Sequence, residues 1–309
     1  MPSFIKVPSK HQSIPPLIAD FCLLLVALVW GASFIVVKNL IVDLPPLPYL
    51  AIRFLIAFGV LLPFLWPQRT HINRSALSKS AVIGTCLFLG YTTQTVGLQY
   101  TTASNAAFIT GLNVVIVPLL VAGYAKHWPR WPILGGALIS AAGLGLLCLG
   151  DSFRASSGDL IVLFCAFCFA CHIFLIGRFA PDVNATVLAA FQILTVALLC
   201  ALGSGLEILF TPASRAISFT PYVGWGILLT AVFCTSIAFL VQSKMQQFTS
   251  ASHTAIIFAS EPVFGALFAY LLAGELLSQN GLIGAALVLT GILLAELGSI
   301  RRSKSGIPV

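Results

Sequence analysis

QTVGLQYTTASNAAFI, at residues 94–109, occurs a second time in altered form as QSKMQQFTSASHTAII at residues 242–257. The two stretches align without a gap at an offset of 148 positions, and glutamine, threonine and serine residues match along with small apolar ones. The same offset then pairs glycines further along the chain: Gly136 with Gly284, Gly143 with Gly291 and Gly150 with Gly298. A constant offset that carries polar residues and glycines together indicates an internal duplication.

The composition around this duplication is that of a membrane protein. Of 309 residues, 59% are hydrophobic and only 8% are charged, whereas soluble domains carry about 25% charged residues. A bilayer core of about 30 Å needs about 20 apolar residues per helix, and continuous runs of that length exclude a barrel of short alternating strands. The sequence therefore predicts an all-α membrane protein with ten transmembrane helices, at 18–41, 48–66, 80–99, 102–124, 131–149, 158–178, 186–210, 222–244, 251–273 and 280–299.

The net charge of +7 is explained by orientation rather than by nucleic acid. If the N-terminus is cytoplasmic, the outside loops hold only Arg154 and Arg215. The inside segments then hold the remaining basic residues outside the membrane: Lys6, Lys10, Arg69, Arg74, Lys79, Lys126, Arg130, Arg178, Lys244, Arg301, Arg302 and Lys304. Positive residues collect on the cytoplasmic side of membrane proteins. We therefore expect both termini, the tail 1–17 and the basic tail 300–309, to be cytoplasmic.

The duplicated unit contains an odd number of helices, which fixes the relation between the two copies. Residues 18–150 and 158–299 each hold five predicted spans. Helices six and seven match helices one and two more faintly, at an offset of 139 that places Gly31 on Ala170 and Ser33 on His172. Five crossings leave the chain on the opposite side of the membrane, so the second copy is expected to be inverted. Inverted repeats with a solute site between them are typical of secondary transporters.

Several short motifs resemble the EamA family of the drug/metabolite transporter superfamily over residues 20 to 299. They are WGAS at 30–33, RF at 53–54 with Ala57, TASNAAFI at 102–109, EPVF at 261–264, GE at 274–275, and Gly284 to Gly291. The resemblance implies a multi-pass carrier of the bacterial inner membrane that moves small metabolites, often amino acids, nucleosides or drugs, usually outward. The two halves differ at one matched position, where Asn113 and Val114 stand against Glu261 and Pro262.

Ionisable side chains inside the membrane are costly and are therefore candidates for function. Glu261 lies near the middle of its span beside Pro262, and it could line the pathway, exchange a proton or pair locally beside a proline kink. Arg53 lies one or two turns below the outer surface, where its guanidinium suits a carboxylate-bearing solute or a salt bridge. Lys38 and Glu296 lie near span ends, so we interpret both as interfacial residues.

A larger set of uncharged polar residues completes the candidate site. If they converge, they form a cavity suited to a polar neutral or zwitterionic solute; taken singly, each could instead bond two helices together. Trp30 could stack on a planar ring or act as a gate. The polar set is Tyr91, Gln94, Asn105, Asn113, His172, Gln192, Gln242 and His253.

Other chemistry has little support in the sequence. There is no phosphate-binding loop for ATP, and the cysteines Cys165, Cys168 and Cys171 beside His172 are better explained as small residues at a helix interface than as metal ligands. A nucleophile with a matching base is not evident, so we expect no cofactor and no enzymatic activity. We predict a secondary transporter working by alternating access, driven by the solute gradient or by protons through Glu261. A passive channel and a polytopic enzyme or scaffold remain alternatives, and the oligomeric state is open.

Overall fold

The computed structural model describes residues 14–149, 156–210, 220–273 and 278–305, and these ranges are helical throughout apart from short connections. Every predicted span falls on helix. The helices are α1 Pro16–Asp43, α2 Pro46–Leu65, α3 Arg74–Gly97, α4 Ala103–Gly111, α5 Asn113–Ala125, α6 Trp131–Leu149, α7 Ser157–Phe179, α8 Ala185–Phe210, α9 Pro221–Ala231, α10 Ala238–Met245, α11 Ala251–Phe258, α12 Glu261–Ala273 and α13 Gln279–Ser305. Three shorter segments are η1 Trp66–His71, η2 Ala180–Asp182 and the π-helical η3 Val232–Ile237.

Some expectations fall outside the described residues or differ from the structure at helix ends. Most of the predicted tail 1–17 lies outside the described residues, as do Glu275 and the side chains of Lys38 and Glu296. The helix α3 begins at Arg74, several residues before the predicted start at 80, because the Asn73 side chain accepts a hydrogen bond from the backbone N–H of Ala76 (2.9 Å) and caps the helix there. The last helix continues to Ser305, into the stretch expected to form the basic tail.

Eight helical segments within the described ranges are long and apolar enough to span a bilayer, judged by length and composition. They are Pro16–Ser33, Pro46–His71, Asn105–Ala125, Trp131–Cys148, Ser157–Asp182, Ala185–Leu206, Pro221–Met245 and Ala251–Phe268. Gln279–Ala295 is a shorter apolar helix. Large apolar side chains such as Leu160 (73% exposed) and Leu202 (62%) face outward, as expected for a surface that lipid covers.

The predicted spans 102–124 and 251–273 are not continuous helices. The first is interrupted at Leu112 between α4 and α5, and the second at Ala259–Ser260 between α11 and α12. At both points the hydrogen bonds join residues three apart, as in a 3₁₀ turn, rather than four apart. Leu112 N–H donates to Ile109 C=O (3.1 Å), and Ser260 N–H donates to Ile257 C=O (3.0 Å). Leu112 and Ser260 match at the offset of 148. Since Val114 stands where the second unit has Pro262, a proline cannot be the shared cause of the two interruptions.

The predicted span 222–244 also departs from a regular α-helix. Between α9 and α10, the segment η3 widens the turn, and the hydroxyl of Thr235 donates to the Thr230 carbonyl (2.9 Å) while that of Ser236 donates to the Ala231 carbonyl (2.9 Å), each five residues back. Single π-helical turns of this kind are frequent at functional sites because they redirect side chains and free carbonyl groups. Here the widened turn faces α1 and α2.

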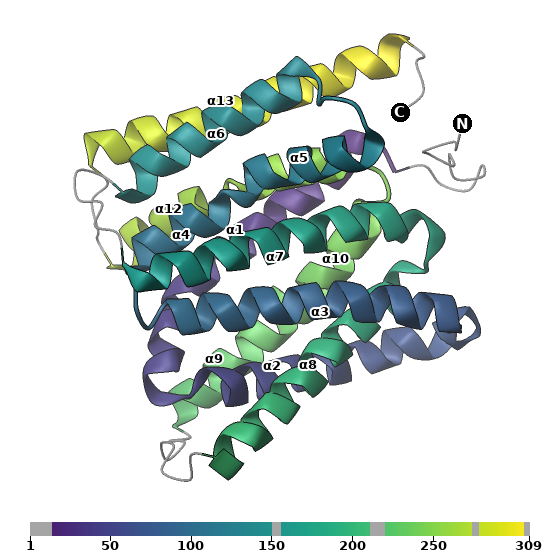
Figure 1. The fold of residues 1–309 in the computed structure, drawn as a ribbon, viewed down its shortest axis with the longest axis vertical. Coiled ribbons are helices and arrows are strands. Elements are labelled where there is room, and N and C mark those ends of the chain that lie inside the picture. The colour runs from purple at the N-terminus through teal and green to yellow at the C-terminus, as the bar shows by residue number, and fades with distance from the viewer. Residues whose placement is uncertain (1–13, 150–155, 211–219, 274–277, 306–309) are drawn as a thin grey trace.

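Helices α6 and α13 lie side by side along one edge of the bundle (Figure 1). A Cβ added to Gly136 would lie 2.6 Å from the carbonyl oxygen of Gly291, and one added to Gly143 would lie 2.6 Å from that of Gly284. The numbers rise along one helix as they fall along the other, so the two helices run antiparallel. The contact is also reciprocal, because Gly136 and Gly143 match Gly284 and Gly291 in the duplicated sequence.

Candidate functional site

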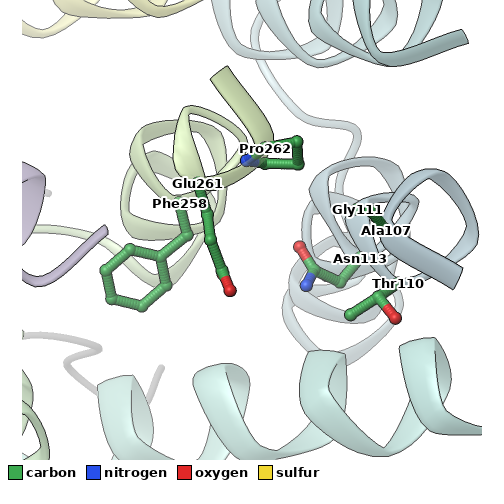
Figure 2. Close-up of a pocket in the computed structure, with 7 residues that line it drawn as sticks. All are labelled: Ala107, Thr110, Gly111, Asn113, Phe258, Glu261 and Pro262. Carbon is green, nitrogen blue, oxygen red and sulfur yellow. The ribbon is translucent and has the colours of Figure 1, made fainter. Parts of the chain in front are cut away.

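A small cavity lies where the two interrupted spans meet. It is lined by Ala107, Thr110, Gly111, Asn113, Phe258, Glu261 and Pro262. The space open to the centre of a water molecule is about 20 Å³, which is room for about one water. Figure 2 shows the Asn113 amide pointing across the gap toward the side chain of Glu261. Two positions that match in the duplicated sequence therefore face each other across this cavity.

The helix interruptions place these two side chains. Asn113 is the first residue of α5 and Glu261 the first residue of α12. The start of a helix carries a partial positive charge, which favours an acidic group such as Glu261 there. Helix α1 approaches the second interruption closely, since a Cβ added to Gly31 would lie 2.6 Å from the carbonyl oxygen of Glu261 and 2.8 Å from the backbone nitrogen of Gly265. Only glycine permits that approach.

Arg53 on α2 is buried, with 3% of its surface exposed. Its Nε donates to the Thr235 hydroxyl (2.8 Å) in the π-helical turn, and its Nη1 donates to the Tyr49 hydroxyl (3.4 Å). The guanidinium also lies 5.2 Å from the centre of the Tyr91 ring and 5.6 Å from that of Phe54. In the part of the chain that the structure describes, no carboxylate pairs with it. Among the described residues, this buried cation therefore has hydroxyl and ring partners but no carboxylate partner.

An aromatic cluster, formed by Trp30, Phe54, Tyr91, Phe239 and Phe258, connects Arg53 with the cavity. The Phe239 ring lies 5.6 Å from Trp30, 6.4 Å from Tyr91 and 6.5 Å from Phe54, measured between ring centres. Trp30 in turn packs edge-on against Phe258 at 5.0 Å, and Phe258 lines the cavity. Trp30 is held by a hydrogen bond from its Nε1 to the Cys234 carbonyl (2.8 Å) in η3. The π-helical turn thus holds both Trp30 and Arg53.

Other predicted site residues bond helices to one another. His172 Nε2 lies 2.8 Å from Gln192 Oε1, and the Gln192 amide donates to the Ser243 hydroxyl (3.1 Å), which joins α7, α8 and α10. The His172 ring also packs against Phe239 of the aromatic cluster (5.6 Å). Gln242 donates to the side-chain oxygen of Gln246 (3.0 Å), the residue that follows the end of its own helix. Of the eleven predicted site residues, Asn113 and Glu261 line the cavity directly.

Gln94 reaches the cavity through a neighbour, whereas Asn105 and His253 lie elsewhere. The Gln94 amide lies 3.4 Å from the hydroxyl of Thr110 in the cavity wall. Asn105 and His253 occupy the first turns of α4 and α11, where they meet Asp159 and Asp20. Sequence reasoning missed both aspartates, although an acidic residue inside each of the predicted spans 18–41 and 158–178 was a usable signal.

The residues Tyr49, Thr235 and Phe258 were missed as well, and the sequence offered little to find them. A threonine or phenylalanine in an apolar span is unremarkable until its partner is known. No group of three or more His, Cys, Asp or Glu side chains within the described ranges is arranged to hold a metal ion.

Comparisons with known proteins identify the family. An uncharacterised transporter of Archaeoglobus fulgidus is 34% identical over 96% of this chain and 91% of its own length. The uncharacterised transporter YyaM of Bacillus subtilis is 28% identical over 96% of this chain and 97% of its own. A solved crystal structure with 20% sequence identity has a TM-score of 0.77, covers 90% of this chain and 98% of its own, and supports the fold alone. The EamA-like transporter family model matches residues 17–149 and 156–297. The chain therefore belongs to the EamA-like transporter family of multi-pass membrane proteins.

Proposed function

We propose that this protein is a secondary carrier with ten membrane spans in two inverted five-helix repeats, 18–150 and 158–299. The two segments that match the family model, 17–149 and 156–297, support the division into repeats. The antiparallel, reciprocal contact of α6 with α13 supports the inversion, because a two-fold axis in the membrane plane relates matched helices in this way. The interrupted spans α4–α5 and α11–α12 are matched in the same manner.

The proposed location is the inner membrane, with both termini in the cytoplasm. Three basic residues support this orientation: Arg69 in η1, and Arg74 and Lys79 in the first two turns of α3. Lys126 and Arg130, between α5 and α6, support it as well. A reporter that is active only in the cytoplasm, fused after residue 309, is expected to be active in cells. If a reporter that is active only outside the cytoplasm is active at the same position, the orientation is the reverse of the one proposed.

The solute is proposed to bind between Glu261 and Arg53, beside the aromatic cluster. The observation that carries this proposal is the cavity at the matched helix interruptions, where Asn113 and Glu261 face each other. Half-helix ends near the middle of the membrane are the usual place for transported solutes. A cavity of about 20 Å³ cannot hold a metabolite, so the halves must separate at one face to admit it, which is the movement of alternating access.

The charges at the site support a small zwitterionic or polar solute. A cation at Arg53 suits a carboxylate, an acid at Glu261 suits an ammonium group, and the rings between them suit an apolar or planar part. Amino acids, nucleosides and cationic drugs are the classes to test, with export as the proposed direction of net movement.

Counterflow into proteoliposomes tests the carrier proposal. Vesicles loaded with unlabelled solute are expected to take up labelled solute transiently above equilibrium, with a rate that saturates as the outside concentration rises. The screen covers amino acids, nucleosides, sugars and cationic drugs. Flux that neither saturates nor responds to solute on the far side would identify a channel and contradict the proposal.

Replacing Glu261 with glutamine separates coupling from exchange. If Glu261 carries the coupling proton, solute accumulation driven by a pH gradient is expected to fall at least tenfold in Glu261→Gln. Counterflow is expected to remain, because exchange requires no net proton movement. Asp182→Asn is the matched control, since Asp182 is a half-exposed carboxylate that pairs with Lys79 at the surface (3.7 Å). Glu261→Gln with unchanged transport and unchanged pH dependence would remove Glu261 from the pathway.

Replacing Gly31 with alanine tests whether α1 positions the helix interruption. The added methyl group meets the backbone of Glu261 and Gly265 rather than a flexible side chain, so the backbone beside the cavity must shift. Such a backbone shift beside a binding site is expected to lower the rate of counterflow by roughly tenfold. Gly59→Ala on α2 is the control, because an added Cβ there has no neighbour within 4 Å. Equal counterflow in the two variants would contradict the proposed role of α1.

A further inference from the structure

A buried carboxylate joins the first turn of α7 to the first turn of α4. Asp159, 9% exposed, accepts hydrogen bonds at Oδ1 from the Thr101 hydroxyl (2.5 Å) and the Asn105 amide (3.4 Å). Its Oδ2 accepts a hydrogen bond from the Ser156 backbone N–H (2.7 Å). We call Asp159, Thr101 and Asn105 the Asp159 cluster. It links the start of the second sequence unit to the fourth predicted span of the first.

A second buried carboxylate joins α1 to α11. Asp20 is 8% exposed and His253 3%. The Nδ1 of His253 lies 3.5 Å from Oδ1 of Asp20 and 3.1 Å from the hydroxyl oxygen of Thr249. We call Asp20, Thr249 and His253 the Asp20 cluster. It links the start of the first unit to the ninth predicted span, in the second unit.

The two clusters occupy matched positions in the duplicated sequence. The offset of 148 takes Thr101 to Thr249 and Asn105 to His253, while the offset of 139 takes Asp20 to Asp159. The helix caps match as well, since the Thr102 hydroxyl accepts from the backbone N–H of Asn105 (3.1 Å) and the Ser250 hydroxyl from that of His253 (3.2 Å). The two offsets therefore bring the same three positions together twice between opposite halves. The contacts differ in one respect, because Thr101 donates to the aspartate in one cluster whereas Thr249 contacts the histidine in the other.

The clusters lie at opposite ends of the bundle, with the cavity between them. Helix α1 starts at the side where α13 ends, and α7 starts at the other side (Figure 1). Asn105 and Thr110 on α4 are five residues apart, as are His253 and Phe258 on α11, which is about 8 Å along each helix. Each cluster thus lies between the cavity and one end of the bundle.

We propose that the two clusters are matched latches that hold the two mouths of the pathway shut. This inference rests on the carrier function proposed above. Each latch bridges the two halves, so one mouth cannot open until its latch is broken. Both latches are formed in this structure, which accounts for a cavity too small for a metabolite. The two latches differ in one residue, because His253 stands where the first unit has Asn105.

Hydrogen–deuterium exchange of the full chain in lipid nanodiscs tests the latches without a solute. Asp20→Asn is expected to raise deuterium uptake severalfold in the first turns of α1 and α11 and to leave the first turns of α4 and α7 unchanged. Asp159→Asn is expected to do the reverse. Thr249→Val and Thr101→Val are milder variants of each cluster, expected to give smaller changes of the same sign. Equal loosening of both ends by either variant, or no change in any, would overturn the proposal.

His253→Asn places the residue of the Asp159 cluster in the Asp20 cluster. It is expected to raise deuterium uptake in the first turns of α1 and α11 less than Asp20→Asn does, and to leave the first turns of α4 and α7 unchanged. Loosening of α4 and α7 in His253→Asn would overturn the assignment. Neither result depends on the counterflow screen, so failure of the latches and failure of the carrier proposal are distinguishable.

Discussion

Replacing Arg53 with methionine is expected to lower transport by roughly ten- to hundredfold without lowering the thermal stability of the protein. Charge-assisted hydrogen bonds contribute about 1.5–3 kcal/mol, and each 1.4 kcal/mol is about tenfold in affinity. Arg53 is buried and has no carboxylate partner among the described residues. Replacing a buried ion pair by apolar residues of similar volume is often neutral or stabilising, and Arg53→Met leaves no carboxylate partner unpaired among the described residues. This expectation rests on the proposed contact between Arg53 and the solute.

Stability and transport must be measured on the same samples to separate this role from a structural one. Arg69→Met is the control, because Arg69 lies exposed over the ring of Trp66 and outside the proposed site. Arg53→Lys keeps the charge but loses the planar fork of donors, so transport is expected to fall between the wild type and Arg53→Met. If Arg53→Met unfolds at a clearly lower temperature, the bonds to Thr235 and Tyr49 are structural and the proposed contact with the solute loses its support.

Much of the fold could be predicted because hydropathy and repetition act along the chain. The ten apolar runs all fall on helices, and the offset of 148 that pairs Gly136 with Gly284 and Gly143 with Gly291 also identifies the glycines in contact between α6 and α13. The interruptions at Leu112 and Ser260 could not be predicted from proline, because only one of them precedes a proline. They depend on how the helices pack in three dimensions. One such contact is that of Gly31 on α1 with the backbone of Glu261 and Gly265.

The candidate site was harder to predict, since a polar residue in a membrane span has many potential partners. Glu261 was identified as an ionisable residue inside the membrane and Asn113 as one of the uncharged polar set, and the structure brings them to one cavity. The π-helical turn that holds Arg53 and Trp30 leaves no clear signal in the sequence Cys234-Thr235-Ser236. Asp20 and Asp159 were overlooked because they stand near span ends, where an acidic residue usually faces water. Their partners His253 and Asn105 were identified, but for the cavity rather than for the ends of the bundle.

Replacing Gly284 with alanine is expected to lower the free energy of unfolding by about 1–3 kcal/mol, the usual effect of overpacking a close contact. The added Cβ would lie 2.5 Å from the carbonyl oxygen of Gly143 and 2.5 Å from the backbone nitrogen of Leu147. Backbone atoms cannot rotate away as a side chain can, so α6 and α13 must separate. Alanine gains about 1 kcal/mol over glycine inside a helix, so a net loss means that packing outweighs helix propensity.

Thermal unfolding followed by tryptophan fluorescence measures this loss, with Gly59→Ala and Gly224→Ala as matched controls. An added Cβ at either control position has no neighbour within 4 Å, so these variants are expected to unfold at the wild-type temperature or slightly above it. Combining Gly143→Ala with Gly284→Ala is expected to cost less than the sum of the two, because both substitutions force the same helices apart. Full additivity, or a Gly284→Ala protein as stable as Gly59→Ala, would mean that the glycine contact between the two halves does not hold them together.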